Sequence, residues 1–146
     1  MFSKILYCTD GSDPAGKAGA IAAAMAKQFG ATLTALHVFH PPAYVYPAFD
    51  GAGFVIDPVD ANRFAQEVQD GIAKRTERTL KEYGVPYEVR QETGYPADVI
   101  VRIADSERFD LVVMGSRGMG AIKAFLLGSV SDRVVHHAHC PVLIVR

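Results

Sequence analysis

Short strand-like segments alternate along the chain with segments of helical periodicity. Most of the strand-like segments are largely apolar, which is typical of strands buried on both faces of a sheet. The expected strands cover residues 5–9, 31–39, 87–93, 111–114 and 142–145. The expected helices cover residues 12–29, 57–84, 96–106 and 129–137. This alternation predicts an α/β fold, with a five-stranded parallel sheet, right-handed crossovers and four helices on both of its faces.

The third expected strand, 87–93, differs from the others because polar residues alternate with apolar ones. A half-polar strand suits the edge of a sheet, so the pattern favours the strand order 3-2-1-4-5, although the order 2-1-3-4-5 is also available. In either order a ligand binds at the carboxyl ends of the strands, where the winding reverses. The favoured order brings the turn at Thr9–Asp10 beside the turn at Met114–Gly115.

Residues typical of helix ends bound the first two helices. Ser12 or Asp13 is placed to cap the first helix, and Gly30 and Gly84 are the expected stops of the first and second. Between these helices, residues 40–56 hold prolines and aromatics without a sustained period, which indicates a long loop. The loop leaves the carboxyl end of the second strand, so we hypothesise that it forms a lid over a ligand or an arm to a partner.

Length and charge limit the classes of function. The 146 residues fit one domain, expected to span 1–146, and 15 basic against 16 acidic residues leave a net charge of −1. This balance predicts no binding to nucleic acid or to an anionic membrane. No apolar run reaches the roughly 18 residues of a membrane span, and the first residues lack a signal-peptide pattern, so a cytoplasmic location is expected.

The two cysteines are expected to be free thiols. Cys8 and Cys140 lie on or beside strands that the favoured order separates by a further strand. Their Cα atoms are then expected about 9 to 10 Å apart. A disulfide spans at most roughly 7 Å, and a reducing compartment also disfavours a bridge.

A glycine-rich segment follows the fourth expected strand, and Ser129 is placed to cap the helix after it. Glycines allow sharp turns and a close approach of the backbone to a ligand. The glycines of this segment are Gly115, Gly118, Gly120 and Gly128. A junction of this kind offers free N–H groups and the positive end of a helix dipole to an anion, which predicts a site for the phosphates of a nucleotide.

Two common phosphate-binding patterns do not match this segment. A Walker A loop needs Lys and Ser or Thr after its second glycine, but Ala121 and Ile122 follow Gly120. A dinucleotide fingerprint that starts at Gly118 has Lys123 where its third glycine belongs. The spacing that is present is Gly115-x2-Gly118-x9-Gly128-Ser129.

This spacing, together with Asp10-Gly11-Ser12 after the first strand, resembles the ATP-binding branch of the universal stress protein family. The resemblance extends over the whole chain and includes the segments 94–97 and 140–145. It implies the Rossmann-like fold of the adenine nucleotide alpha hydrolases, with ATP as the ligand. It also implies a homodimer.

The resemblance implies a role for ten residues. Thr9 and Asp10 would lie against the nucleotide, with Asp10 able to help hold a Mg²⁺ ion beside the phosphates, and Val38 would contact the adenine. The residues that would wrap the ribose and phosphates are Met114, Gly115, Arg117 and Gly118. The residues that would offer N–H groups and a hydroxyl at the helix start are Gly128, Ser129 and Val130.

Each of these residues also has a purely structural interpretation. Asp10 could form an Asx turn, Ser129 could be only a helix cap, and Arg117 could be a solvated loop charge. Their convergence on one switch point of the sheet favours the ligand site. His37 and His40 are interpreted as ordinary edge or loop residues.

The histidine and cysteine cluster at residues 136–140 is a candidate metal site. A shared ligand set is difficult there, because adjacent residues on a helix do not face one another. The cluster also lies at a helix C-terminus, where the dipole favours histidine, and at the end of the sheet opposite to the expected nucleotide. A metal site is therefore disfavoured.

The function predicted first is a cytoplasmic, dimeric, ATP-binding stress protein that acts as a nucleotide-dependent regulatory module. The last strand, 142–145, is short, apolar and expected at an edge, so antiparallel pairing across a two-fold axis would cover it. The alternatives are a slow ATPase or phosphotransferase, for which the sequence shows no arranged base, and a nucleotide-free dimeric interaction protein. A redox or phosphoacceptor module is disfavoured, because Thr93 and Gly94 stand where a receiver needs an acid.

Overall fold

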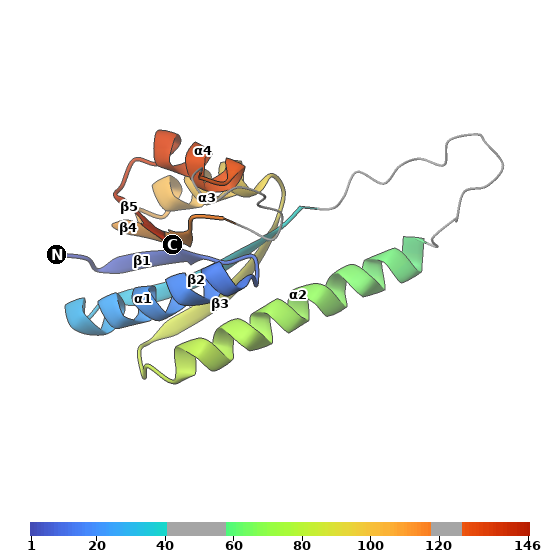
Figure 1. Ribbon diagram of the computed structural model, residues 1–146, viewed down its shortest axis with the longest axis horizontal. Helices are drawn as coiled ribbons and strands as arrows, with labels where there is room; N and C mark the ends of the chain where they lie inside the picture. The colour runs from blue at the N-terminus through green and yellow to red at the C-terminus, as the bar shows by residue number, and fades with distance from the viewer. Residues whose placement is uncertain (41–57, 118–126) are drawn as a thin grey trace.

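The computed structural model describes residues 1–40, 58–117 and 127–146. Over these residues the chain forms a five-stranded parallel sheet with helices on both faces (Figure 1). The strands are β1 (Lys4–Cys8), β2 (Thr32–Phe39), β3 (Tyr87–Thr93), β4 (Leu111–Gly115) and β5 (Val142–Val145). The helices are α1 (Asp13–Phe29), α2 (Pro58–Lys81), α3 (Pro96–Ser106) and α4 (Ser129–His137). The expected loop 40–56 lies outside the described residues, apart from His40.

The sheet order is β3-β2-β1-β4-β5, which confirms the favoured prediction and excludes the order 2-1-3-4-5. β3 lies at one edge, and most of its residues are only half-buried, as its polar composition predicts. The winding reverses between β1 and β4, where Cys8 pairs with Met114 at the carboxyl ends. The turns that follow these two strands therefore lie beside one another.

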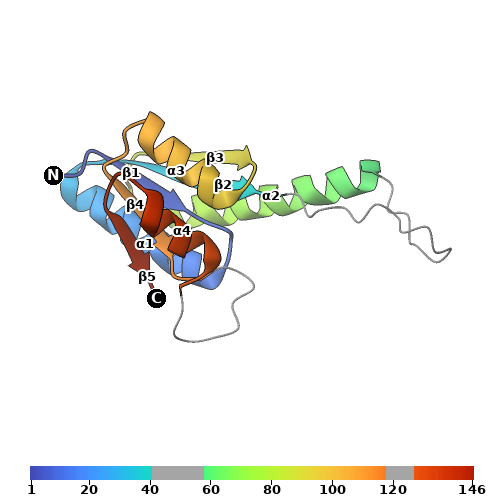
Figure 2. The same cartoon turned by 90° about the horizontal axis from the view of Figure 1, so that it is seen from above.

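Two apolar layers hold the helices on the sheet. α1 and α2 cover one face, and α3 and α4 cover the other (Figures 1 and 2). Along β1 the side chains alternate between the layers, with Ile5 and Tyr7 in the first and Leu6 and Cys8 in the second. β4 is buried along its full length, which explains why it is apolar throughout.

The helix ends follow most of the sequence signals. Ser12 caps α1 by accepting the N–H of Ala15 at 3.3 Å, and Gly30 follows the helix in the left-handed conformation with a φ of 66°. α2 ends at Lys81, before the stop predicted at Gly84. Gly84 has a φ of 63° and belongs to the turn that follows the helix.

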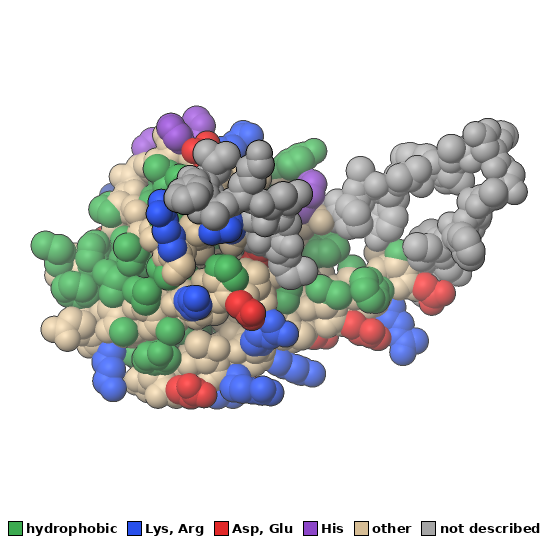
Figure 3. Space-filling view, viewed as in Figure 1, with side chains coloured by type: hydrophobic (Ala, Val, Ile, Leu, Met, Phe, Trp, Pro, Cys, Tyr) green, Lys and Arg blue, Asp and Glu red, His purple; other side chains and the backbone are tan. Residues whose placement is uncertain are grey.

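α2 has 24 residues, and its amino-terminal part extends beyond the carboxyl end of the sheet (Figure 2). Acidic and basic side chains are interspersed along it (Figure 3), and Arg63 Nε lies 3.3 Å from Glu67 Oε1. Such exposed pairs add little stability, so apolar residues such as the fully buried Leu80 hold α2 on the sheet. Within the described part of the chain, no helix is both long and apolar enough to cross a membrane.

Candidate functional site

A cavity of about 420 Å³ lies at the carboxyl ends of β1, β2 and β4. Its volume falls within the roughly 300–1,000 Å³ that is typical of small-molecule sites. Three helices begin beside it, because Ala15 of α1, Pro96 of α3 and Ser129 of α4 all line the cavity. The positive ends of three helix dipoles therefore lie at this site.

The turn after β1 forms one wall of the cavity. Asp10 makes the Asx turn that the sequence allowed, because its Oδ1 accepts the N–H of Ser12 at 3.0 Å. The N–H of Gly11 donates to Thr9 Oγ1 at 3.1 Å. Gly11 has a φ of 79°, and an added Cβ would lie 2.8 Å from Cγ1 of Ile72 in α2, so only glycine fits there. The turn is held by its own hydrogen bonds and by α2, with Asp10 at the cavity.

The end of β4 passes close to the start of α1 at Gly115. A Cβ at this position would lie 3.2 Å from the carbonyl carbon of Pro14 and 3.3 Å from the nitrogen of Ala15. Neither Gly115 nor Gly128 has a positive φ, so a left-handed backbone conformation does not explain either glycine. Close approach of two backbones explains Gly115, whereas a Cβ at Gly128 would meet only ordinary contacts, at 3.4 Å and beyond.

Hydrogen bonds join the end of β4 to the start of α4. The N–H of Gly128 donates to the carbonyl oxygen of Ser116 at 2.8 Å. The hydroxyl of Ser131, a residue that is 2% exposed, lies 3.0 Å from the same Ser116 oxygen and 2.9 Å from the Gly128 oxygen. These contacts fix the first turn of α4 against the carboxyl edge of the sheet.

Gly128, and not Ser129, is the N-cap of α4, so the prediction of a Ser129 cap is wrong. The Gly128 carbonyl accepts the N–H of Asp132 at 2.9 Å and closes the first turn, which leaves Ser129 as the first helical residue. Among the described residues no side chain caps α4, whereas Ser12 caps α1. The first N–H groups of α4 thus receive no side-chain cap from residues 1–40, 58–117 and 127–146, and a helix start of this kind can bind an anion.

Apolar side chains form the remaining walls. Leu36 and Val38 come from β2, Ile100 comes from α3 and Met114 comes from β4. The thiol of Cys8 also lines the cavity, and burial raises its pKa, so it stays neutral at physiological pH.

The described lining residues carry few full charges. Asp10 is the one carboxylate among them, and Arg117 is the one cation. The cavity therefore combines apolar walls with an uncapped helix start and a single ion of each sign. This arrangement suits a ligand with a flat apolar part and an anionic part.

The structure brings nine of the ten expected site residues to this one cavity: Thr9, Asp10, Val38, Met114, Gly115, Arg117, Gly128, Ser129 and Val130. The tenth, Gly118, lies outside the described residues. Sequence reasoning missed six further residues that line the cavity: Cys8, Ala15, Leu36, Pro96, Ile100 and Ser131. The signal for Pro96 was present, since it begins a helix and every helix of such a fold begins near the carboxyl edge of the sheet.

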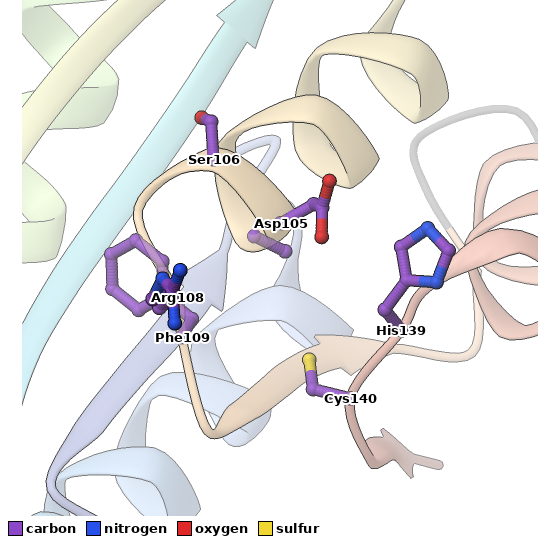
Figure 4. A pocket seen from close by; sticks show the side chains of 7 residues that line it. Asp105, Ser106, Arg108, Phe109, His139 and Cys140 are labelled. Carbon is purple, nitrogen blue, oxygen red and sulfur yellow. The ribbon is translucent and has the colours of Figure 1, made fainter.

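A second cavity, of about 450 Å³, lies at the opposite end of the sheet (Figure 4). Its lining includes Asp105, Arg108, His139 and Cys140, which follow or end α3 and α4. Helix C-termini present carbonyl oxygens and a negative dipole end, so this cavity does not suit an anion. Asp105, His139 and Cys140 all line this cavity (Figure 4), but the described residues contain no group of three His, Cys, Asp or Glu side chains that could hold a metal ion.

Comparison with known proteins gives the same family over the whole chain. The profile of the universal stress protein family matches residues 1–146. A universal stress protein of Thermus aquaticus is 38% identical over 152 residues, which cover 100% of both chains.

Solved structures of similar proteins share the fold. The universal stress protein UspA of Lactobacillus plantarum has 29% sequence identity and a TM-score of 0.79, and the match covers 99% of this chain and 98% of that one. A universal stress protein solved in complex with cAMP has 27% identity and a TM-score of 0.73, with 99% and 97% of the two chains covered.

Proposed function

Because the chain belongs to the universal stress protein family, we propose that it binds ATP in the cavity at the carboxyl ends of β1, β2 and β4. The observation that carries this proposal is the convergence of nine expected site residues on one cavity of ligand size. The similar protein solved with cAMP supports an adenine nucleotide as the class of ligand. We further propose that the bound nucleotide regulates the protein in a stress response.

The adenine base is proposed to lie beside Val38. β1 and β2 pair only as far as Cys8 and Leu36, whereas β2 continues to Phe39 beside β3. The carbonyl of Leu36 accepts the N–H of Thr9 at 2.9 Å, so the backbone groups of Leu36 face β1. Backbone groups alternate in direction along a strand, and those of Val38 therefore face the gap where β1 has ended. One donor and one acceptor beside apolar walls suit the edge of an adenine ring.

The phosphates are proposed to lie at the start of α4. The first N–H groups of this helix have no side-chain cap within the described part of the chain, and Ser129 and Val130 line the cavity. Arg117 lines the same cavity and adds a positive charge. A free helix start and a guanidinium are both suited to phosphate oxygens.

Asp10 is the proposed protein ligand of Mg²⁺. Magnesium is commonly bound by one or two carboxylates together with phosphate oxygens and water, and Asp10 supplies one carboxylate at this cavity. Over the described residues no cluster of three protein ligands is preformed, which fits an ion that enters with the phosphates. Mg²⁺ would then neutralise phosphate charge when the nucleotide is bound.

Nucleotide turnover is proposed to be slow at most. Asp10 is the only carboxylate on the described lining, and one of its oxygens already accepts the N–H of Ser12.

The proposal includes a cytoplasmic location. The free thiols of Cys8 and Cys140 suit a reducing compartment.

The edge strand β5 is the proposed dimer interface. β5 has four residues, lies at the end of the sheet and leaves Val142, Leu143 and Ile144 only half-buried. A short apolar edge of this kind is an aggregation hazard unless it is covered. Pairing of two copies across a two-fold axis would cover it and satisfy its outer backbone groups.

Calorimetric titration tests the nucleotide proposal. ATP with Mg²⁺ is expected to bind at a one-to-one ratio per chain, and GTP is expected to bind more weakly because its base presents different donors and acceptors to Val38. Replacement Asp10→Asn is expected to reduce the gain in affinity that Mg²⁺ gives, while ATP alone binds with little change. Absence of binding for ATP, AMP and cAMP would favour a nucleotide-free interaction protein.

A further inference from the structure

His37 is a buried side chain behind the proposed base site, and the role of an ordinary edge or loop residue does not describe it. It is 8% exposed and lies on the face of β2 that packs against α1 and α2, next to Val38. Its Nδ1 lies 3.0 Å from the carbonyl oxygen of Thr9. Its Nε2 is buried and has no hydrogen-bond partner within the described structure.

These two facts determine the form of the ring. A carbonyl oxygen only accepts hydrogen bonds, so Nδ1 must carry the proton and donate it to Thr9. A neutral ring then has a bare Nε2, which is an acceptor without a donor. A buried acceptor of this kind is unfavourable, and a leucine of similar size would avoid it. Histidine at this position therefore lowers the stability of the fold, so stability does not explain its presence.

The reason lies in the hydrogen bond that His37 replaces. The last hydrogen bond between β1 and β2 is donated by the Thr9 N–H to the Leu36 carbonyl oxygen. If the parallel ladder continued, the Val38 N–H would donate the next hydrogen bond to the Thr9 carbonyl oxygen. The Thr9 oxygen instead accepts the imidazole N–H, and the pairing of β1 with β2 stops at Cys8 and Leu36. The side chain of His37 thus occupies the acceptor that would otherwise close the two strands.

We propose that His37 is a positioning residue that keeps the carboxyl ends of β1 and β2 apart and so leaves the backbone of Val38 available to the base. This inference rests on the proposed nucleotide site. The same contact orients the Thr9–Asp10 peptide, because the planar trans geometry couples the Asp10 N–H to the direction of the Thr9 carbonyl. His37 itself does not line the cavity.

Three replacements of His37 separate this role from simple packing. Asn places its amide nitrogen near the position of Nδ1, so His37→Asn is expected to keep the bond to Thr9 and to bind ATP within about 3-fold of the original protein. Gln places its amide nitrogen near Nε2, and Leu has no donor. His37→Gln and His37→Leu are therefore expected to weaken ATP binding by about 10-fold or more, and Leu is expected to do so without loss of thermal stability.

Leu33→Ala is the matched control. Leu33 lies on the same strand and the same face, is 1% exposed, and is four residues from His37 toward the opposite end of the sheet. This replacement is expected to lower stability and to leave ATP affinity unchanged. Equal affinity of the Asn, Gln and Leu variants would overturn the inference, as would a loss of affinity in Leu33→Ala as large as that in His37→Leu.

Amide hydrogen exchange without nucleotide tests the inference even if the protein binds no nucleotide. The Val38 amide is expected to exchange much faster than the Leu36 amide in the original protein and in His37→Asn. In His37→Leu the Thr9 oxygen becomes available, so exchange at Val38 is expected to slow by about 10-fold or more. A Val38 amide as protected as that of Leu36 in the original protein would overturn the inference about His37, whereas failure to bind nucleotide alone would overturn only the proposed function.

Discussion

Replacement Gly128→Asp is expected to stabilise the fold and to abolish nucleotide binding at the same time. Gly128 is the N-cap of α4, with a φ of −65° and a ψ of 157° that any residue can adopt. An added Cβ would lie 3.4 Å from Arg117 Cα and from the Ser116 oxygen, which are ordinary contacts. The carboxylate of an aspartate there could accept the first N–H groups of the helix, for which Gly128 itself offers no side-chain acceptor.

The two effects have opposite signs and different sizes. Relative to glycine, a side-chain cap raises the free energy of unfolding by a few tenths of a kcal/mol, and a negative charge at the helix start adds about 0.3–1 kcal/mol. The free energy of unfolding is therefore expected to rise by about 0.5–1 kcal/mol. For a chain of this size the Tm would rise by about 1–4 °C. A carboxylate about 5 Å from a phosphate costs about 3 kcal/mol at an effective dielectric of 20, which corresponds to at least about a 100-fold loss of affinity.

Gly128→Asn is the matched control, because asparagine has the same shape and capping ability without the charge. Thermal unfolding and calorimetric titration with ATP and Mg²⁺ would be measured for both variants. The difference between them isolates the electrostatic effect on the phosphates. Equal ATP affinity of the Asp and Asn variants would refute the placement of the phosphates at α4.

Three further expectations concern the rest of the chain. Ile144→Pro removes an N–H that points away from β4 and that the proposed β5 pairing would use. Analytical ultracentrifugation should therefore show a monomer for this variant and a dimer for the original protein. A dimer in both would exclude the β5 interface. Ser12→Ala should lower the unfolding free energy in urea by about 1 kcal/mol, with Ser12→Asp restoring it. Burial raises the pKa of Tyr7 from 10.0 to about 12, so stability should fall as pH rises from about 10 to 12, and less so in Tyr7→Phe.

The sign of the Tyr7 effect follows from which form the fold prefers. The neutral phenol is buried, 2% exposed, and donates to the Ala15 carbonyl oxygen at 2.7 Å. The unfolded chain loses the phenolic proton near pH 10, whereas the folded chain holds it to about pH 12. Its contribution to stability is therefore complete below pH 10 and is lost as the pH approaches 12, about 3 kcal/mol for a shift of two pKa units.

The sequence predicted the strand order because one strand was unlike the rest. The polar residues of β3 are tolerable only where one side of the strand faces solvent, and this placed β3 at the edge. With that edge fixed, the Thr9–Asp10 turn had to lie beside Met114 and Gly115. The juxtaposition of these two turns therefore followed from strand composition and from the rule that ligands bind at the switch point, whereas the individual site residues followed from the resemblance to the family.

The errors arose where local sequence has two outcomes of similar energy. Gly128 and Ser129 are both acceptable N-caps, and the choice depends on tertiary contacts such as the buried Ser131 hydroxyl. Gly115 was correctly expected to matter, but its cause is the approach of α1, which periodicity does not reveal. His37 looked like an edge residue, because the sequence does not show which carbonyl its ring will reach.

The most direct test of the central claim is a map of backbone amide chemical shifts during titration with ATP and Mg²⁺. Changes are expected at Thr9, Asp10, Val38, Ser129 and Val130, which line the cavity at the carboxyl edge of the sheet. The amides around the opposite cavity, such as Asp105 and Cys140, are expected to stay unchanged. Shifts confined to the opposite cavity, or no shifts at saturating ATP, would contradict nucleotide binding at this site.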